Sequence, residues 1–173
     1  MFINDRRVNV SADPASTGSA SVDPDLMANS KFMAPAESTR ERLLGCWRLL
    51  EYSETPEGGQ PRYRLGAHPL GTILYTCDGY VSAQLAMSPP YVQQDRPTAY
   101  ALAYSGPFDV DEQTGMVAHH VVVSVIPSWL GTTQLRKVHF PEAGMLVLSA
   151  TEPIGPRGTL TAIRVTWLRE PPR

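Results

Sequence analysis

Charged residues are scarce in this sequence, and their scarcity excludes two classes of partner. Of the 173 residues 18% are charged, the formal net charge is −2, and no run of lysine or arginine occurs. A surface that binds nucleic acid or anionic lipid needs such a run. We therefore expect neither nucleic acid nor a membrane surface as a partner.

Cysteine is also rare, and its pattern excludes a zinc site. Cys46 and Cys77 stand alone, without the CxxC or Cys/His spacing of metal ligands. They lie in or beside separate expected strands and could pair only if those strands were neighbours in suitable register. We favour two free thiols. A glycine-rich phosphate loop and a nucleophile elbow are missing too, so we expect no metal and no cofactor.

Long apolar runs are the third absence. Residues 1–10 lack the apolar core of a signal peptide. No stretch approaches the roughly 20 apolar residues that a bilayer-spanning helix needs. We expect a soluble, cytoplasmic protein.

Glycine and proline, by contrast, are frequent, at 13 and 16 residues, and turn signals separate a train of strand-like runs. Asp78-Gly79 is a hairpin signal between two of these runs. Thr98–Tyr104 is expected to form a helical turn or part of a loop over an opening. The expected strands cover residues 46–53, 71–76, 80–87, 106–111, 116–126, 132–140, 145–151 and 159–169.

This pattern predicts an all-β fold, an eight-stranded antiparallel up-and-down barrel within residues 37–173, whose closure removes exposed edges. A β-sandwich is the competing fold. Ser38 and Glu41 have the spacing of a capping box, which predicts a short helix at 38–44 that closes one end. Residues 1–36 are expected to form a disordered arm. A lid over the barrel mouth is the alternative, built on four apolar residues of the arm: Leu26, Met27, Phe32 and Met33.

Several stretches between Leu43 and the C-terminus resemble, in order, the bacterial and fungal lipocalin-like domain family. They are Leu44-Gly45-Cys46-Trp47, Pro69–Thr76, Asp78–Leu85, His119-His120, Pro127–Thr132 and Gln134–Arg136. The resemblance implies a calycin-type barrel with a central cavity, in which Gly45 permits close backbone approach and Trp47 plugs the closed end. Some proteins with similar barrels are cyclases or isomerases that act on polyketide-like substrates in secondary metabolism. The family offers no fixed catalytic signature, so candidate sites must come from the residues.

Alternation along each strand predicts which side chains face the cavity. In most strands one alternating set is more apolar and should point inward. In residues 80–87 both alternating sets could face inward, and we expect the more apolar set to do so by default. Gln84, in the other set, stays a candidate for the cavity. The predicted inward residues that bear on function are Ile73, Tyr75, His119, Val121, Gln134, Arg136, Phe140, Ile163, Val165 and Trp167.

Four of these side chains are polar and are our candidate catalytic residues: Tyr75, His119, Gln134 and Arg136. An unpaired buried polar group costs about 1–3 kcal/mol, so they must pair with each other, with water or with a ligand. Arg136 beside Tyr75 or Gln134 could hold a carbonyl, an enolate or a carboxylate. His119 could be a general acid or base, because a free imidazole has a pKa of ~6.5.

The candidate substrate-binding residues are Gln84, Trp129, Ile73, Val121 and Phe140. Each candidate has a structural alternative. His119 can be a hydrogen-bonded interior histidine, Tyr75 a packing residue, and Gln134 and Arg136 a structural pair. Trp129, in the loop after Pro127, lines the mouth or caps the core.

Three functions are compatible with such a barrel. The first is a cofactor-independent, pericyclase-like cyclase or isomerase that holds a hydrophobic, polyketide-like substrate in a reactive conformation. The alternative is a non-catalytic carrier or sequestering protein for a hydrophobic metabolite. The third is a filled barrel with a structural or protein-interaction role. A homodimer stays open.

Overall fold

The computed structural model describes residues 36–88 and 101–172. The predicted arm and its lid alternative therefore lie outside the described residues, apart from Ala36. So do the first three residues of the expected helical turn at 98–104. No helix in the described part of the chain is long and apolar enough to cross a membrane.

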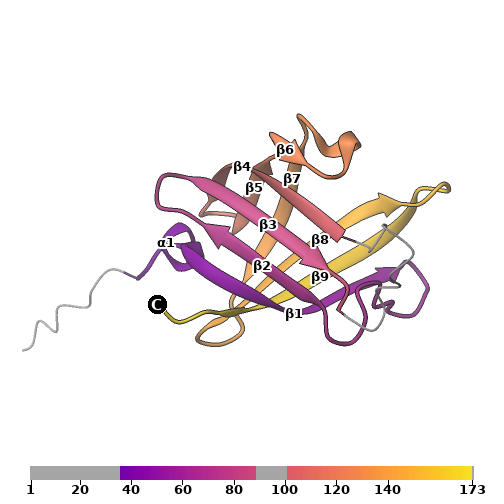
Figure 1. Ribbon diagram of the computed structural model, residues 1–173, viewed down its shortest axis with the longest axis horizontal. Coiled ribbons are helices and arrows are strands. Elements are labelled where there is room, and N and C mark those ends of the chain that lie inside the picture. Colours follow the sequence, from indigo (N-terminus) through magenta and orange to yellow (C-terminus); the bar gives the residue numbers. More distant parts are fainter. Residues whose placement is uncertain (1–35, 89–100, 173) are drawn as a thin grey trace, which may run out of the picture. The chain divides into compact units, whose positions relative to one another are not determined.

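The described chain forms one short α-helix and is otherwise dominated by strands (Figure 1). The helix, α1 (Thr39–Leu43), begins with the predicted capping box: the Ser38 hydroxyl accepts from the Glu41 backbone N–H, and the Glu41 carboxylate accepts from the Ser38 N–H. A 3-10 turn, η2 (Pro127–Trp129), lies between two strands. The strands are β1 (Gly45–Pro56), β2 (Leu70–Tyr75), β3 (Tyr80–Ala86), β4 (Ala101–Asp111), β5 (Met116–His120), β6 (Val123–Ser124), β7 (Thr133–His139), β8 (Met145–Ile154) and β9 (Thr159–Arg169).

The strands close a barrel in which neighbours in sequence are neighbours in space. The order is β3-β2-β1-β9-β8-β7-β5-β4, and β3 also pairs with β4, which closes the ring. The pairings around this ring are antiparallel. The short β6 pairs with β4 beyond the end of β5. The predicted eight-stranded up-and-down barrel is confirmed, and the sandwich is excluded.

Trp47 fills one end of this barrel, beneath α1. Its side chain is 1% exposed, and its indole N–H donates to the Leu43 carbonyl at 2.7 Å. The Arg169 guanidinium lies 4.1 Å from the ring centroid of Trp47, and Phe140 packs against the same indole. Phe140 therefore belongs to the plug, and its predicted place on the cavity wall is wrong.

Gly45 serves a purpose other than close backbone approach. Its φ is +115°, a conformation that side-chain-bearing residues rarely adopt, and the atom nearest to an added Cβ would be a side-chain nitrogen of Arg169. Close backbone approach occurs instead at Gly106 in β4, where a Cβ would lie 1.8 Å from the His120 carbonyl oxygen.

The predicted inward faces are confirmed for most strands by burial. Alternate residues of β2, β5, β7 and β9 are buried, and β5 carries His119 inward as expected. In β3 the buried set is Val81, Ala83 and Leu85. Gln84 is exposed on the outer face and donates to the Ser82 hydroxyl at 2.7 Å. Its predicted place in the cavity is therefore wrong, because the apolar residues of β3 face the interior and Gln84 lies on the opposite face.

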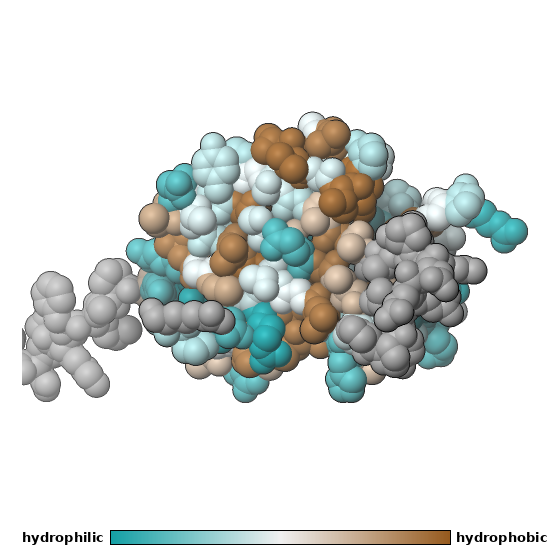
Figure 2. Space-filling view, in the orientation of Figure 1, coloured by the Kyte–Doolittle hydropathy of each residue, from teal (hydrophilic) through white to brown (hydrophobic). Residues whose placement is uncertain are grey.

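The expected strand at 116–126 breaks after His120. Val121 stays buried, but the chain then turns across β4, and Val123 and Val125 are each 61% exposed. Apolar surface is gathered over the region of β6 in Figure 2. The predicted alternation thus ends at Val121, because residues 123–124 pair with β4 rather than continuing along β7.

The residues from Ala101 to Tyr104 form a strand, not the expected helical turn or loop. β4 starts at Ala101 and pairs with β3 from Ala101↔Ala86 to Pro107↔Tyr80. This pairing closes the barrel and turns Tyr104 inward, where it is 9% exposed. Cys46, half-buried opposite Leu74, and the exposed Cys77 are free thiols, as expected.

Candidate functional site

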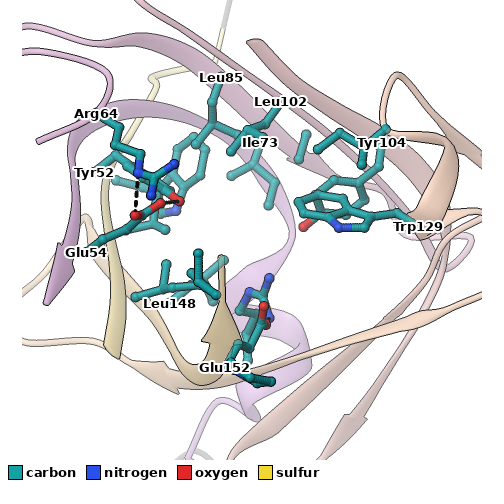
Figure 3. Close-up of a pocket in the computed structure, with 18 of the residues that line it drawn as sticks. Tyr52, Glu54, Arg64, Ile73, Leu85, Leu102, Tyr104, Trp129, Leu148 and Glu152 are labelled. Atoms are coloured by element: carbon teal, nitrogen blue, oxygen red, sulfur yellow. Dashed lines mark hydrogen bonds and ion pairs between the residues drawn. The ribbon is translucent and has the colours of Figure 1, made fainter. Parts of the chain in front are cut away.

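A cavity of about 310 Å³ lies inside the barrel (Figure 3). This volume is at the lower end of the roughly 300–1,000 Å³ of small-molecule sites. Much of the wall is apolar and comes from strands around the ring, including Ile73, Leu85, Leu102, Leu148, Val165 and Trp167. Trp129, from η2, also contributes to the wall and packs edge-on against Tyr104 with ring centroids 5.7 Å apart. The predicted cavity positions of Ile73 and Trp129 are thus observed.

Arg136 and Glu152 form a charged pair in the wall. Arg136 is 7% exposed, and its guanidinium donates to the Glu152 carboxylate at 2.5 Å and to the Gln134 amide oxygen at 3.0 Å. Gln134 in turn donates to the Thr132 hydroxyl at 3.2 Å. Arg136 lines the cavity, whereas Gln134 is not on the cavity wall and accepts a hydrogen bond from the guanidinium. Glu152 was not foreseen, because it extends β8 beyond the expected strand end at residue 151.

A second charged pair lies elsewhere on the wall. Glu54 is 4% exposed; one carboxylate oxygen is 2.6 Å from the Arg64 guanidinium, and the other accepts from the Tyr52 hydroxyl at 2.8 Å. Figure 3 shows this group facing the cavity, apart from Glu152 and from Tyr104 with Trp129. None of these three residues was a candidate from the sequence.

Glu54 lies one residue beyond the expected strand end at residue 53, and a β-bulge turns its side chain inward. The pairing of β1 with β9 shifts between Leu49 and Glu51, so one extra residue lies in β1. Before the bulge the inward residues are odd-numbered, as with Trp47 and Leu49; after it Tyr52 and Glu54 are the inward ones. A strict alternation counted from Trp47 places Glu54 in solvent.

His119 lies between two tyrosines, behind the cavity wall. The Tyr75 hydroxyl is 2.9 Å from its Nε2, and the Tyr104 hydroxyl is 2.7 Å from its Nδ1. Tyr75 is 2% and His119 1% exposed, and of the three residues Tyr104 lines the cavity. The three side chains form a hydrogen-bonded chain, and its last member, Tyr104, lines the cavity.

Burial keeps this chain uncharged. Desolvation, with smaller contributions from Arg136 and His120, lowers the pKa of His119 to about 3. Desolvation also raises the pKa of Tyr104 to about 12 and that of Tyr75 well above its ordinary value. The imidazolium that would serve as a general acid is therefore not populated near neutral pH, contrary to the expectation from a free imidazole.

The remaining predicted binding residue, Val121, is buried in the core but is not on the cavity wall. Tyr104 was missed because its segment was expected to be a helical turn or a loop. Among the described residues no cluster of His, Cys, Asp and Glu could hold a metal ion.

Comparison with known proteins places this geometry in a family. Residues 44–170 match the lipocalin-like domain. The chain belongs to the lipocalin-like domain family. A 4'-hydroxy-3'-methoxypropiophenone carrier protein of Aspergillus oryzae is 38% identical over 76 residues, which cover 40% of this lipocalin-like chain and 68% of the relative.

A solved structure described as EF1p2_mFAP2b bound to DFHBI also aligns with this lipocalin-like chain. The TM-score is 0.47 at 13% identity, and the alignment covers 78% of this chain and 98% of the other.

Proposed function

We propose that this lipocalin-like barrel is a carrier, which binds a small, largely apolar molecule in its cavity and releases it unchanged. The observation that carries the proposal is the state of the polar groups around the cavity. Both carboxylates of the wall are already paired with arginines, and the histidine is neutral and sealed behind Tyr104. Such a wall can orient a ligand, but its described residues offer no free acid or base for proton transfer.

The relative from Aspergillus oryzae supports this proposal, because it is described as the carrier of an aryl ketone. A ligand of that class would place its ring among the apolar side chains and its few polar atoms against the polar ones. We therefore propose 4'-hydroxy-3'-methoxypropiophenone as the first probe.

The binding experiment uses quenching of tryptophan fluorescence, since Trp129 and Trp167 both line the cavity. We expect saturable quenching by the probe in the full-length protein. Ala83→Leu should weaken binding at least about tenfold, because Ala83 lines the cavity and the larger side chain would fill part of it. Ala118→Leu, on the outer face of β5, is the matched control and should bind like the wild type. Equal loss of binding in both variants, or no quenching at all, would contradict the proposal.

A cyclase or isomerase is the second candidate, and one observation favours it. Tyr104 and Arg136 both line the cavity, and a hydroxyl and a guanidinium that donate to one carbonyl could stabilise a developing oxyanion. Native mass spectrometry of the purified protein, followed by extraction of any bound molecule, separates the candidates. A carrier returns the added molecule with its structure unchanged after long incubation, whereas a cyclase or isomerase returns an isomer of the same mass with a different spectrum.

A further inference from the structure

The hydrogen-bonded chain Tyr75–His119–Tyr104 has a direction, and the direction follows from counting donors. A neutral imidazole carries one N–H, so His119 donates to one tyrosine and accepts from the other. Both ring nitrogens are engaged, Nε2 with Tyr75 and Nδ1 with Tyr104. Two arrangements are therefore available, and they differ in which tyrosine keeps a free O–H.

The surroundings of Tyr75 decide between them. Its hydroxyl has His119 as its hydrogen-bond partner, and within residues 36–88 and 101–172 no second acceptor contacts it. If Nε2 carried the proton, the buried O–H of Tyr75 would have no acceptor, which is costly. If Nδ1 carries it, Tyr75 donates to Nε2 and Nδ1–H donates to Tyr104. The Tyr104 O–H is then left over, but Tyr104 lines the cavity, where a ligand or water can accept.

Two other groups of the wall also offer donors. Trp167 lines the cavity, and its buried indole N–H has no acceptor among the described residues. Arg136 uses three of its N–H groups on Leu135, Glu152 and Gln134, and a guanidinium has five. This part of the wall thus carries several N–H and O–H donors, and an acceptor atom of a ligand could form hydrogen bonds with them.

Among the described residues of the wall, the formal charges cancel. The ionised side chains that line the cavity are Glu54 with Arg64 and Glu152 with Arg136, two acids and two bases in two ion pairs. A ligand carboxylate would have to compete with Glu152 for Arg136, and it would add an uncompensated charge beside the buried Arg136 and Glu54. A neutral acceptor meets neither obstacle.

We infer that His119 is held as the Nδ1–H tautomer, that it thereby fixes Tyr104 as a hydrogen-bond donor to the cavity, and that this donor-rich wall selects neutral ligands with a carbonyl-type acceptor. His119 and Tyr75 are positioning residues here, and Tyr104 is the residue that contacts the ligand. The ligand part of the inference rests on the proposed carrier function; the tautomer part does not.

The tautomer is measured without any ligand. In protein labelled with ¹⁵N-histidine, Nε2 couples to both ring-carbon protons and Nδ1 mainly to one, so the coupling pattern identifies each nitrogen. The ¹⁵N chemical shift of each then shows which nitrogen carries the proton. His119→Phe assigns the signal among the four histidines of the chain. We expect the protonated nitrogen to be Nδ1. Protonation at Nε2 would overturn the inference, whether or not the protein binds a ligand.

The selectivity is measured with compounds of matched size. Propiophenone and propylbenzene share a carbon skeleton and differ by the carbonyl oxygen, and 3-phenylpropanoate adds a negative charge. We expect Tyr104→Phe to reduce the preference for propiophenone over propylbenzene by about three- to tenfold, the effect of one neutral hydrogen bond. Tyr80→Phe, whose side chain is 53% exposed, is the matched control and should keep the wild-type preference.

The wild type should bind propiophenone more tightly than 3-phenylpropanoate. An unchanged preference in Tyr104→Phe, or tighter binding of the carboxylate, would overturn the assigned selectivity while leaving the carrier function intact. If neither neutral compound binds the wild type, the ligand part of the inference fails together with the carrier proposal, and the tautomer measurement still decides the rest.

Discussion

At the scale of single residues, burial determines what His119 contributes to the protein. The folded barrel holds its pKa at about 3, against 6.5 for an ordinary imidazole. Between these values the unfolded chain takes up a proton that the folded protein does not bind. Stability is therefore fully present above pH 6.5 and is lost as the pH falls toward 3.

The free energy of unfolding should fall by up to about 1.4 kcal/mol per pH unit between pH 6 and 4.5 because of His119. Urea unfolding at several pH values in this window measures the slope. Glu41, Asp111 and Glu112 have pKa values that hydrogen bonds lower from ordinary values of 4.5, 3.8 and 4.5, so they add to the slope only at the acid end of this window. His119→Phe should flatten the slope, and His68→Phe, at an exposed position, should retain it. A steep slope that survives in His119→Phe would show that other groups cause it.

A second prediction at this scale concerns the ion pair between Arg136 and Glu152. Arg136 is buried, so loss of its partner leaves a positive charge in a poorly hydrated place. Glu152→Gln should lower the free energy of unfolding by about 2 kcal/mol, a value below that of a fully buried pair because the Glu152 side chain is 35% exposed.

Glu170→Gln is the matched control for that measurement, which chemical denaturation provides. Glu170 pairs with Arg48, whose side chain is 52% exposed, and such surface pairs contribute about 0–1 kcal/mol. Equal effects of the two substitutions would mean that Arg136 is hydrated in the free protein.

At the scale of elements, Gly106 is the point where β4 meets the chain that leaves β5. A Cβ there would lie 1.8 Å from the His120 carbonyl oxygen and 2.9 Å from its carbon, so the backbones would have to separate. We expect Gly106→Ala to lower the free energy of unfolding by at least about 3 kcal/mol. Gly59→Ala, in a turn, should cost less than about 1 kcal/mol, since its nearest neighbours are atoms of Pro56 at 3.3 Å. Urea denaturation followed by tryptophan fluorescence compares the two variants. An effect of Gly106→Ala as small as that of Gly59→Ala would show that the backbones at Gly106 and His120 can separate at little cost.

Sequence patterns predicted the elements whose conformation is determined locally. The capping box, the Asp78-Gly79 hairpin and the inward faces of β2, β5, β7 and β9 all follow from nearest neighbours and alternation. The sequence patterns failed where pairing with a distant strand determines the local conformation. Ala101–Tyr104 is a strand because β3 pairs with it, and Glu54 turns inward because of a bulge against β9.

The same distinction applies to the candidate site. The sequence predicted that Arg136, Ile73, Trp129, Tyr75, His119 and Gln134 face the cavity. The first three line it, whereas Tyr75, His119 and Gln134 are buried behind its wall. The sequence could not show that His119 sits behind Tyr104, because the segment that contains Tyr104 was expected to be a helical turn or a loop and is a strand through its pairing with β3. Burial and pairing, rather than residue type, decided which polar groups reach the cavity.

At the scale of the whole barrel, closure depends on the pairing of β1 with β9, which runs from Trp47↔Arg169 to Pro56↔Thr161. Roughly a hundred residues separate these strands, and a ribosome adds about 5–20 residues per second. For about 5–20 s of synthesis, β1 therefore waits for its partner, with Trp47 and Leu49 unable to reach their final burial. The nascent chain exposes an apolar strand edge throughout that interval, so chaperone binding during translation is the expected route to a closed barrel in the cell.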